Sequence, residues 1–550
     1  MSKEKSADKG IYVRKATGLV REINLFDAFV AASSTSGAVM IPVAWTTAWA
    51  MYGLPGADLV TGALVAMVIS LVLVTCYGLL SATMPRSGGD YIFNSRILHP
   101  FIGFAASFNY NWIEVFWSGL VVYWIGTMAF PSSFGTLGFL LKNQTLVDIA
   151  SMASTRMGAT VIGIVALAIM GVILLVGTKI LFRLQDALFI FGTIGMLAAV
   201  LVILTSSAGG FVSRFNDVMA PFTSSGDSFN HIIQLATDNG FAAPTSFLPG
   251  ATMFGVIVAL GAFGWGFYMA WIGGEFKGAD SVKRQLTVSW GATLFNGLFF
   301  ALIISQLYRV VSYQFMSSAQ YLWDYVPSAY PLPVPPYATL YFTLLGPNPI
   351  INALIGFSII VWPFIMTTTV LMYMTRSMFA WSFDRIMPKG LAYVSPRFHT
   401  PVVSTLVSVV GMAIAMILIA WLPSSFYWEA MAVTTMLPWI SIFPLTGLAA
   451  AILPWRGKTK TLYDASPAKK YKIGGLPIMA LTGVLLFVIS VVVVYFYLIN
   501  PSLGITDVWV LLRWIGVALV FDVVIYSVSR YYRQRQGIDL GLSFREIPAE

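Results

Sequence analysis

Charged residues are scarce in this chain. Only 10% of its 550 residues are Asp, Glu, Lys or Arg, against about 25% in a typical soluble domain, while 58% are hydrophobic. A soluble protein of this length could not cover its surface with so few charges. The scarcity excludes a soluble globular enzyme, a disordered protein and a nucleic-acid-binding module.

Cysteine and histidine are almost missing as well. The single cysteine, Cys76, excludes an intrachain disulfide and a cysteine-based metal site. The three histidines lie far apart, which argues against a zinc cluster. Neither HExxH nor the phosphate-binding pattern G-x-x-x-x-G-K-[ST] occurs. We therefore expect neither an enzyme nor an ATP-driven pump, and no cofactor.

What the chain has in abundance is long apolar stretches. A bilayer core about 30 Å thick needs roughly 20 apolar residues per helix, and helices satisfy their own backbone polar groups there. Twelve stretches meet this length: 27–50, 57–82, 98–130, 158–178, 181–206, 251–275, 286–312, 348–378, 401–422, 428–454, 474–498 and 504–530. The pattern predicts an all-α polytopic membrane protein with twelve transmembrane helices.

The basic residues predict the orientation of these helices. With the N-terminus in the cytoplasm, 27 of the 32 Lys and Arg fall in cytoplasmic segments, as the positive-inside rule requires. Only Lys142, Arg156 and Arg214 fall outside the membrane on the other side. We expect both termini in the cytoplasm. We attribute the net charge of +9 to the basic residues of the cytoplasmic segments, which set the topology.

Two of the predicted spans are interrupted. The first contains four hydroxyl residues, 33–36, followed by Gly37 and Pro42, and the sixth contains five glycines within 261–274. Each interior glycine weakens a helix by about 1 kcal/mol relative to alanine. Close helix packing through small residues is the alternative interpretation of either segment.

The positions of the interruptions favour a functional interpretation. Spans 1 and 6 open two groups of five, and an odd number of spans inverts the second group. Interrupted helices at matching places of two inverted repeats indicate the central site of a secondary transporter. Free N–H groups there suit an anion and free carbonyls suit an ammonium. The predicted parts are 1–24 (cytoplasmic tail), 25–206 (first repeat), 207–250 (extracellular loop), 251–454 (second repeat), 455–473 (cytoplasmic loop), 474–530 (two peripheral helices) and 531–550 (cytoplasmic tail).

Nearly the whole chain resembles the amino acid-polyamine-organocation superfamily of permeases, whose five-plus-five inverted repeat is called the LeuT fold. SGAVMIP at 36–42 resembles the helix 1 break, although Thr35 replaces a glycine. MPRSGGDYIF at 84–93 resembles the motif before helix 3, and GAFGW with GGEFKGADSVKR resembles helix 6 and its tail. RSMFAWSFDRIMPKGLAYVSPRFHTP at 376–401 is the most specific match, and FREIPAE resembles an end common in archaeal and bacterial members.

The resemblance implies a substrate site at the two breaks. It implies that N–H groups of Ser36, Gly37 and Ala38 hold the substrate carboxylate, and that carbonyls near Gly261, Ala262 and Gly264 hold the ammonium. Phe263 and Trp265 are the candidates for an aromatic cap. Some members carry a lysine seven residues after a helix 5 glutamine, in place of sodium; here that position after Gln185 is Gly192.

Two polar groups within the spans are further candidates. In span 3, Asn109 and Glu114 are candidate substrate-binding residues. Glu114 is expected to accept a proton or to contact a basic substrate group, because a buried charge is costly in a bilayer. A structural glutamate is the alternative. In span 8, Thr368 and Thr369 are candidate sodium ligands, since hard cations prefer oxygen. The alternative is hydrogen bonding of both threonines to their own helix.

The sequence predicts a plasma-membrane secondary transporter that moves amino acids or related amines by alternating access, coupled to protons or sodium. The alternatives are an amino acid or amine exchanger, and a channel or sensor on the same scaffold. We expect a small-molecule substrate and the lipid bilayer as partners, no nucleic acid and a monomeric transport unit. The substrate, the coupling ion and the oligomeric state stay open.

Overall fold

The computed structural model describes residues 21–37, 39–457, 459–503 and 507–544. Within them, eleven helical stretches are long and apolar enough to cross a membrane. They are α4 (Leu59–Thr83); α6 (Pro100–Trp124) with the π-helices η2 (Ile125–Ala129) and η3 (Pro131–Gly135) and with α7 (Thr136–Leu140); α9 (Arg156–Val176); α10 (Thr178–Thr205); α13 (Pro249–Phe263) with the 3₁₀ helix η4 (Gly266–Trp271); α14 (Val282–Val310); α17 (Pro349–Phe383); α18 (Val402–Trp421); α19 (Ser424–Ser441) with α20 (Phe443–Ile452); α22 (Ile478–Ile499); and α23 (Val508–Arg535). The prediction of an all-α polytopic membrane protein is confirmed.

The first predicted span consists of short pieces, and this is why it is not among the eleven. It comprises α1 (Leu25–Ser34), α2 (Met40–Trp45), the π-helix η1 (Thr46–Ala50) and α3 (Met51–Gly53). A capping box starts α1, in which the Asn24 side chain accepts from the N–H of Asp27 and the Asp27 carboxylate accepts from the N–H of Asn24. The interruption between α1 and α2 coincides with the hydroxyl-rich segment.

Shorter elements lie outside the spans. Those on the side predicted to be extracellular are α8 (Gln144–Ser154), α11 (Ala208–Thr223), α12 (Ser228–Asp238), α15 (Tyr313–Tyr325), η5 (Pro327–Ala329), α16 (Ala338–Leu345) and η8 (Pro501–Leu503). Those on the other side are α5 (Asp90–Ile97), η6 (Lys389–Ala392), α21 (Lys460–Ala465), η7 (Pro467–Lys470), α24 (Leu540–Ser543) and the antiparallel strands β1 (Lys472–Ile473) and β2 (Leu476–Pro477), in which Lys472 pairs with Pro477. The predicted loop at 207–250 is therefore largely helical.

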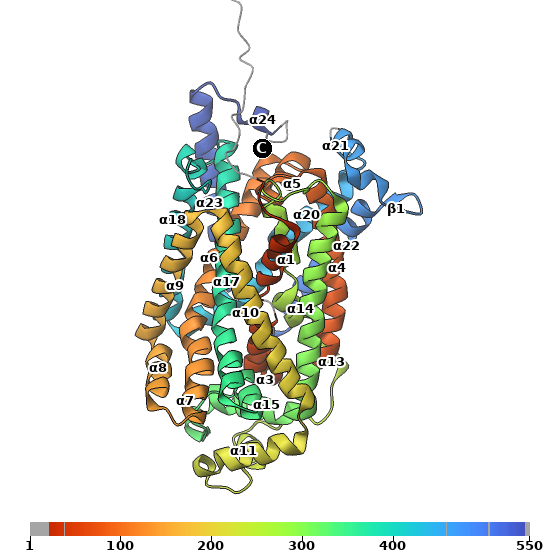
Figure 1. Cartoon of the computed structure of the whole chain (residues 1–550). Coiled ribbons are helices and arrows are strands. Elements are labelled where there is room, and N and C mark those ends of the chain that lie inside the picture. Colours follow the sequence, from red (N-terminus) through yellow and green to blue (C-terminus); the bar gives the residue numbers. More distant parts are fainter. Residues whose placement is uncertain (1–20, 38, 458, 504–506, 545–550) are drawn as a thin grey trace, which may run out of the picture.

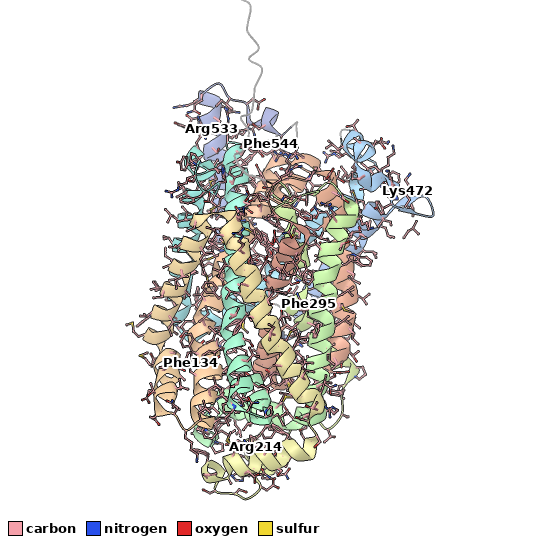
Figure 2. The ribbon with its side chains drawn as sticks, viewed as in Figure 1. Phe134, Arg214, Phe295, Lys472, Arg533 and Phe544 are labelled. Carbon is pink, nitrogen blue, oxygen red and sulfur yellow. The ribbon has the colours of Figure 1, made fainter. Side chains whose placement is uncertain are left out.

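The long helices run side by side along one axis, and α1 lies in their midst (Figure 1). It packs on α10 and α14, while α4 packs on α13 and α14. Elements α5, α21 and α24 lie at one end of the molecule and α11 at the other. Figure 2 accordingly places Lys472 and Arg533 far from Arg214.

Burial separates the central helices from the peripheral ones. Helix 6 consists of α13 and η4, and 89% of the residues in its most apolar stretch are buried. In the most apolar stretch of α23, only 22% of the residues are buried. The exposed side chains of α22 and α23 are largely apolar, for example Val484 and Val520. Such surfaces suit lipid rather than water. Helix 6 therefore forms part of the centre and α23 part of the rim.

Candidate functional site

The helix 1 break is a tight turn of residues 35–37 between α1 and α2. Gly37 has φ +63°, in the left-handed region, where an added Cβ would lie 2.6 Å from Cβ of Ile41. The N–H groups of Ser36 and Gly37 donate to the carbonyls of Ser33 (3.3 Å) and Ser34 (2.8 Å). These two predicted carboxylate donors thus bond within the turn. Ala38, the third, lies outside the described residues.

The helix 6 break lies at Gly264 and Trp265, between α13 and η4. Gly261 and Ala262 still belong to α13, whose carboxyl end carries the negative end of the helix dipole. The Trp265 indole N–H donates to the carbonyl of Gly261 at 2.9 Å. Phe263 is fully buried and packs on Phe300, with ring centres 5.6 Å apart. Of the two predicted aromatic caps, Phe263 thus packs on α14, which is helix 7 and carries Phe300.

Hydroxyl groups join the two breaks directly. Thr35 Oγ1 donates to the carbonyl of Trp265, and Ser36 Oγ donates to the carbonyl of Phe263, each at 3.2 Å. Asn296 of α14 donates its side-chain amide to the carbonyl of Ser33 at 3.2 Å. The carbonyls of Ser33 and Trp265 also accept backbone hydrogen bonds, from the N–H groups of Ser36 and Tyr268. The two breaks form one polar unit.

Glu114 of α6 points into this unit. Its Oε1 accepts a hydrogen bond from the hydroxyl of Tyr268 on η4, which in turn accepts one from Tyr110. The glutamate is 4% exposed, and within the described residues its Oε2 has no hydrogen-bond partner. Tyr268 also stacks on Tyr373 of α17, at 5.0 Å between ring centres. A buried carboxyl with one open oxygen therefore faces the helix 6 break.

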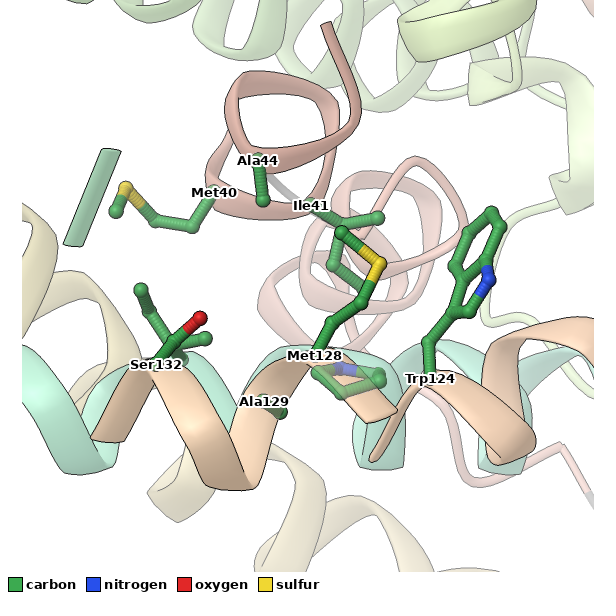
Figure 3. A pocket seen from close by; sticks show the side chains of 9 residues that line it. Met40, Ile41, Ala44, Trp124, Met128, Ala129 and Ser132 are labelled. Atoms are coloured by element: carbon green, nitrogen blue, oxygen red, sulfur yellow. The ribbon is translucent and has the colours of Figure 1, made fainter. Parts of the chain in front are cut away.

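A small cavity lies between these groups. Its lining comes from helix 1, helix 3 (α6), helix 6 and helix 10 (α19 with α20). The lining residues are Thr35, Glu114, Trp117, Trp265, Tyr268, Thr434 and Thr435. Trp265 is therefore the predicted cap that lines the cavity. A second cavity, which is apolar, lies between α2, helix 3 and α17 (Figure 3).

Asn109 lies apart from this cavity. It is half-buried and lies beside Asp522 of α23, and its neighbours on the same face, Trp112 and Phe116, pack on Phe521 and Trp514. Five residues separate Asn109 from Glu114, which is roughly 140° around a helix of 3.6 residues per turn. Helix 3 thus turns Glu114 toward helix 6 and Asn109 toward helix 12, and we leave Asn109 out of the proposed substrate site.

The two threonines of helix 8 bond to their own helix. Thr368 Oγ1 donates to the carbonyl of Phe364 and Thr369 Oγ1 to that of Ile365, both at 2.7 Å. Thr369 also accepts from the Gln185 side-chain amide, and Thr368 lines a small cavity beside Gln185, on the side of helices 4 and 5. This arrangement matches the structural alternative for hydroxyl groups in a membrane helix.

A scan against family models matches residues 23–520 to the amino acid permease family. The chain belongs to this family. No match was found among curated proteins. As an amino acid permease, the protein is an amino acid transporter that spans the membrane several times, and the predicted superfamily is confirmed.

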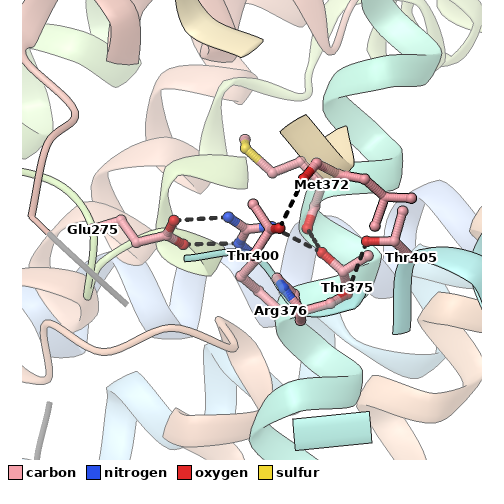
Figure 4. A network of polar contacts seen from close by, with 8 residues as sticks. Glu275, Met372, Thr375, Arg376, Thr400 and Thr405 are labelled. Atoms are coloured by element: carbon pink, nitrogen blue, oxygen red, sulfur yellow. Dashed lines mark hydrogen bonds and ion pairs between the residues drawn. The ribbon is translucent and has the colours of Figure 1, made fainter. Parts of the chain in front are cut away.

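The permease carries buried ion pairs on the predicted cytoplasmic side of the site. Arg376 of α17 binds Glu275 through two hydrogen bonds of 2.7 and 2.8 Å, and both side chains are almost fully buried (Figure 4). Arg96 pairs with Asp384 at 2.6 Å, also buried. A buried pair loses much of its solvation, so removing one partner is more costly than the pair is stabilising. These pairs tie helix 8 to the tail of helix 6 and to α5.

Sequence reasoning missed several residues of the candidate site. It did not single out Tyr268, because tyrosine is common in membrane proteins and no local pattern marks one that reaches a glutamate 154 residues away. It also missed Tyr110, although the spacing of four residues places Tyr110 on the same face of α6 as Glu114. It also missed Thr434 and Thr435, which reach the cavity from helix 10. A helical projection of span 3, by contrast, would have separated Asn109 from Glu114.

Proposed function

We propose that this permease is a secondary transporter that moves an amino acid across the plasma membrane by alternating access, driven by a proton gradient. The substrate binds between the helix 1 and helix 6 breaks, and Glu114 carries the coupled proton. The observation that supports this most directly is the hydrogen bond from Tyr268 to the buried Glu114, beside the cavity that Thr35 and Trp265 line.

The proposed carboxylate and ammonium contacts follow from the polarity of the breaks. The start of α2 offers backbone N–H groups and the positive end of a helix dipole, while the end of α13 offers carbonyls and the negative end. The turn at Ser36 and Gly37 must then open, so that their N–H groups exchange the carbonyls of Ser33 and Ser34 for the substrate carboxylate.

Proton coupling follows from the environment of Glu114. An ionised carboxylate in a bilayer costs several kcal/mol unless it is paired, so proton binding relieves that cost. Tyr268 lies on η4, which is the inner half of helix 6 in the predicted topology. Gain or loss of the proton changes the hydrogen bond that joins helix 3 to this half-helix. In this way the proton and the conformation of helix 6 become linked.

The geometry favours protons over sodium as the coupling ion. Both predicted sodium ligands of helix 8 direct their hydroxyl protons to their own helix, and Gln185 occupies one side of Thr369. Oxygen ligands for a hard cation usually number six or more. We therefore assign no metal ion to Thr368 and Thr369.

The test is uptake of radiolabelled amino acids into proteoliposomes, with proton and sodium gradients imposed separately. We expect the proton gradient alone to drive uptake, and Glu114→Gln to lower this uptake at least tenfold while exchange with preloaded substrate continues. The matched control is Asp522→Asn, which neutralises the other buried carboxyl near helix 3 and should leave proton-driven uptake in place.

Three outcomes would contradict the proposal. Uptake driven by a sodium gradient would show that sodium, and not the proton, is the coupling ion. Exchange without any driven uptake in the wild-type protein would make the permease an exchanger. Loss of proton-driven uptake in Asp522→Asn but not in Glu114→Gln would show that Asp522 of α23, and not Glu114, carries the coupled proton.

A further inference from the structure

The segment that leads into helix 11 (α22) is basic. Between residues 455 and 477 the sequence has six Lys and Arg residues and one acidic residue, Asp464. The carboxylate of Asp464 pairs with two of the lysines, at 2.5 and 3.1 Å. Among the described residues, no ion pair involves Lys470 or Lys472. Two lysine charges of this segment are therefore available to an anion outside the protein.

The β1–β2 hairpin (472–477) ends this segment and carries an apolar face. Gly474 and Gly475 form its turn with φ of 55° and 84°, which suits the two-residue turns of hairpins. Ile473 pairs with Leu476, so that their side chains lie on the same face. Each of them is 59% exposed. Two exposed apolar side chains thus lie side by side at the tip of a defined turn.

The opposite face of the hairpin turns back toward the protein. Lys472 pairs with Pro477, and both lie on the face opposite to Ile473 because successive side chains of a strand alternate. Pro477 is buried where α22 begins, while Lys472 is exposed, as is Lys470. The apolar pair therefore faces away from the protein, and the two lysines lie beside it.

The hairpin lies at the end of a membrane span. Pro477 directly precedes Ile478, the first residue of the spanning helix α22. Figure 1 shows α21 and β1 projecting sideways from the long helices, and Figure 2 shows Lys472 at this outer edge. The segment is held there because Tyr463 and Ala468 are buried and η7 packs on α4. A sideways position at the end of a span lies over the lipid headgroups that surround the protein.

We propose that the β1–β2 hairpin is a membrane-surface anchor, which inserts Ile473 and Leu476 among the lipid headgroups and binds anionic phospholipids through Lys470 and Lys472. Anionic lipid matches both features of the hairpin, since it offers a negative surface and an apolar interior within one layer. In the predicted topology this is the cytoplasmic leaflet. The anchor fixes the start of helix 11 against the bilayer, and the inference does not depend on the proposed transport function.

The first test measures whether the hairpin enters the bilayer. The fluorophore NBD is attached to Ile473→Cys or Leu476→Cys in the full-length protein, which is reconstituted into nanodiscs of phosphatidylcholine and phosphatidylglycerol; the native Cys76 is buried. Lipids with a nitroxide on the acyl chain should quench the emission at either position at least threefold more than at Lys472→Cys, the control on the opposite face. Equal quenching at all three positions would overturn the insertion.

The second test separates anionic headgroups from lipid in general. With the label at Ile473→Cys, adding phosphatidylglycerol to phosphatidylcholine nanodiscs should increase the quenching at least twofold, and high salt should reverse this increase because salt screens exposed charges. The double variant Lys470→Gln with Lys472→Gln should lose the increase. Its control, Lys283→Gln with Lys389→Gln, removes two exposed lysines outside the hairpin and should keep it. An increase that persists in the hairpin variant, or none in the labelled parent, would overturn the binding of anionic lipid.

Discussion

Asp90 is a buried carboxyl outside the membrane-spanning segments. It opens α5, is fully buried, and within the described residues neither of its oxygens has a hydrogen-bond partner among the side chains. Burial raises the pKa of Asp90 to about 8, and the backbone N–H groups of Tyr91 and of Asp90 itself oppose this only in part. Tyr77 of α4 is the titratable group that faces it. Near neutral pH the Asp90 carboxyl is therefore protonated.

Asp90→Asn should remove a pH dependence of stability. The carboxyl has its ordinary pKa near 3.9 in the unfolded chain and about 8 in the folded protein, so its contribution is fully present below about pH 4 and is lost as the pH rises through 8. Thermal unfolding of the purified protein, followed by tryptophan fluorescence from pH 5 to 9, should show a falling Tm for the wild type and a flatter course for Asp90→Asn. Asp148→Asn, at an exposed position of α8, is the control. Parallel courses for wild type and Asp90→Asn would contradict the assignment.

Single residues were predictable from the sequence only where the cause is local. Glu114 could be singled out because a carboxyl inside an apolar stretch is costly wherever the fold places it. Its partner Tyr268 depends on how helix 3 meets helix 6, which no spacing encodes. Asp522 had no assignment for the same reason, since Asn109, beside it, lies on another span.

At the scale of elements, the two breaks have different causes. Gly37 takes a left-handed conformation that other residues adopt only with strain, so the helix 1 turn depends on this glycine. The helix 6 break instead uses backbone with ordinary negative φ, for Gly264 has φ −71°. There the glycine matters for space, because an added Cβ would lie 3.3 Å from Ser70 Oγ and closer to the Leu260 carbonyl.

Gly37→Ala should therefore disturb the central site. A left-handed alanine costs ~1–2 kcal/mol, and its Cβ would collide with the Ile41 side chain. We expect a lower Tm and at least tenfold slower transport, with protein still inserted in the membrane. Gly516→Ala on α23, where nothing lies within 4 Å of an added Cβ, tests the same change without the turn. Equal behaviour of the two variants would show that the helix 1 turn does not need glycine.

Element type was predictable because length and apolar composition decide which segments cross a bilayer. Eleven predicted spans match single helical stretches, and the first matches the interrupted helix 1. The π-helices in helix 3 were not predicted, since Ile125–Gly135 differs little in composition from its surroundings. The sequence predicts a loop where the amphipathic helices α11 and α12 lie, because this segment is too polar for a span.

The whole molecule depends on contacts between distant parts of the chain. The ion pair of Arg376 with Glu275 joins residues 101 apart, and the hydroxyl bonds from Thr35 and Ser36 to helix 6 join residues more than 220 apart. Such contacts bring the start of the second predicted repeat against the start of the first. Sequence patterns indicated that both helices are broken, but not which atoms connect them.

The two ends of the molecule allow a direct test of orientation. Elements α5, α21 and α24, which belong to basic segments, lie at the end opposite α11 (Figure 1). We therefore expect the first end in the cytoplasm, because positively charged segments remain on that side. Lys472, in the β1–β2 hairpin, and Gly226, between α11 and α12, are exposed markers of the two ends.

Cysteine labelling can distinguish these ends because the chain has a single cysteine, the buried Cys76. A membrane-impermeant maleimide applied to intact cells should label Gly226→Cys and leave Lys472→Cys unlabelled until the membrane is permeabilised. The protein with Cys76 alone should stay unlabelled in both conditions, because its thiol is buried. The opposite labelling pattern would invert the topology. It would also place η4, which carries the tyrosine bonded to Glu114, on the extracellular side of the helix 6 break, so that the proton on Glu114 would be linked to the outer half of helix 6 instead of the inner half.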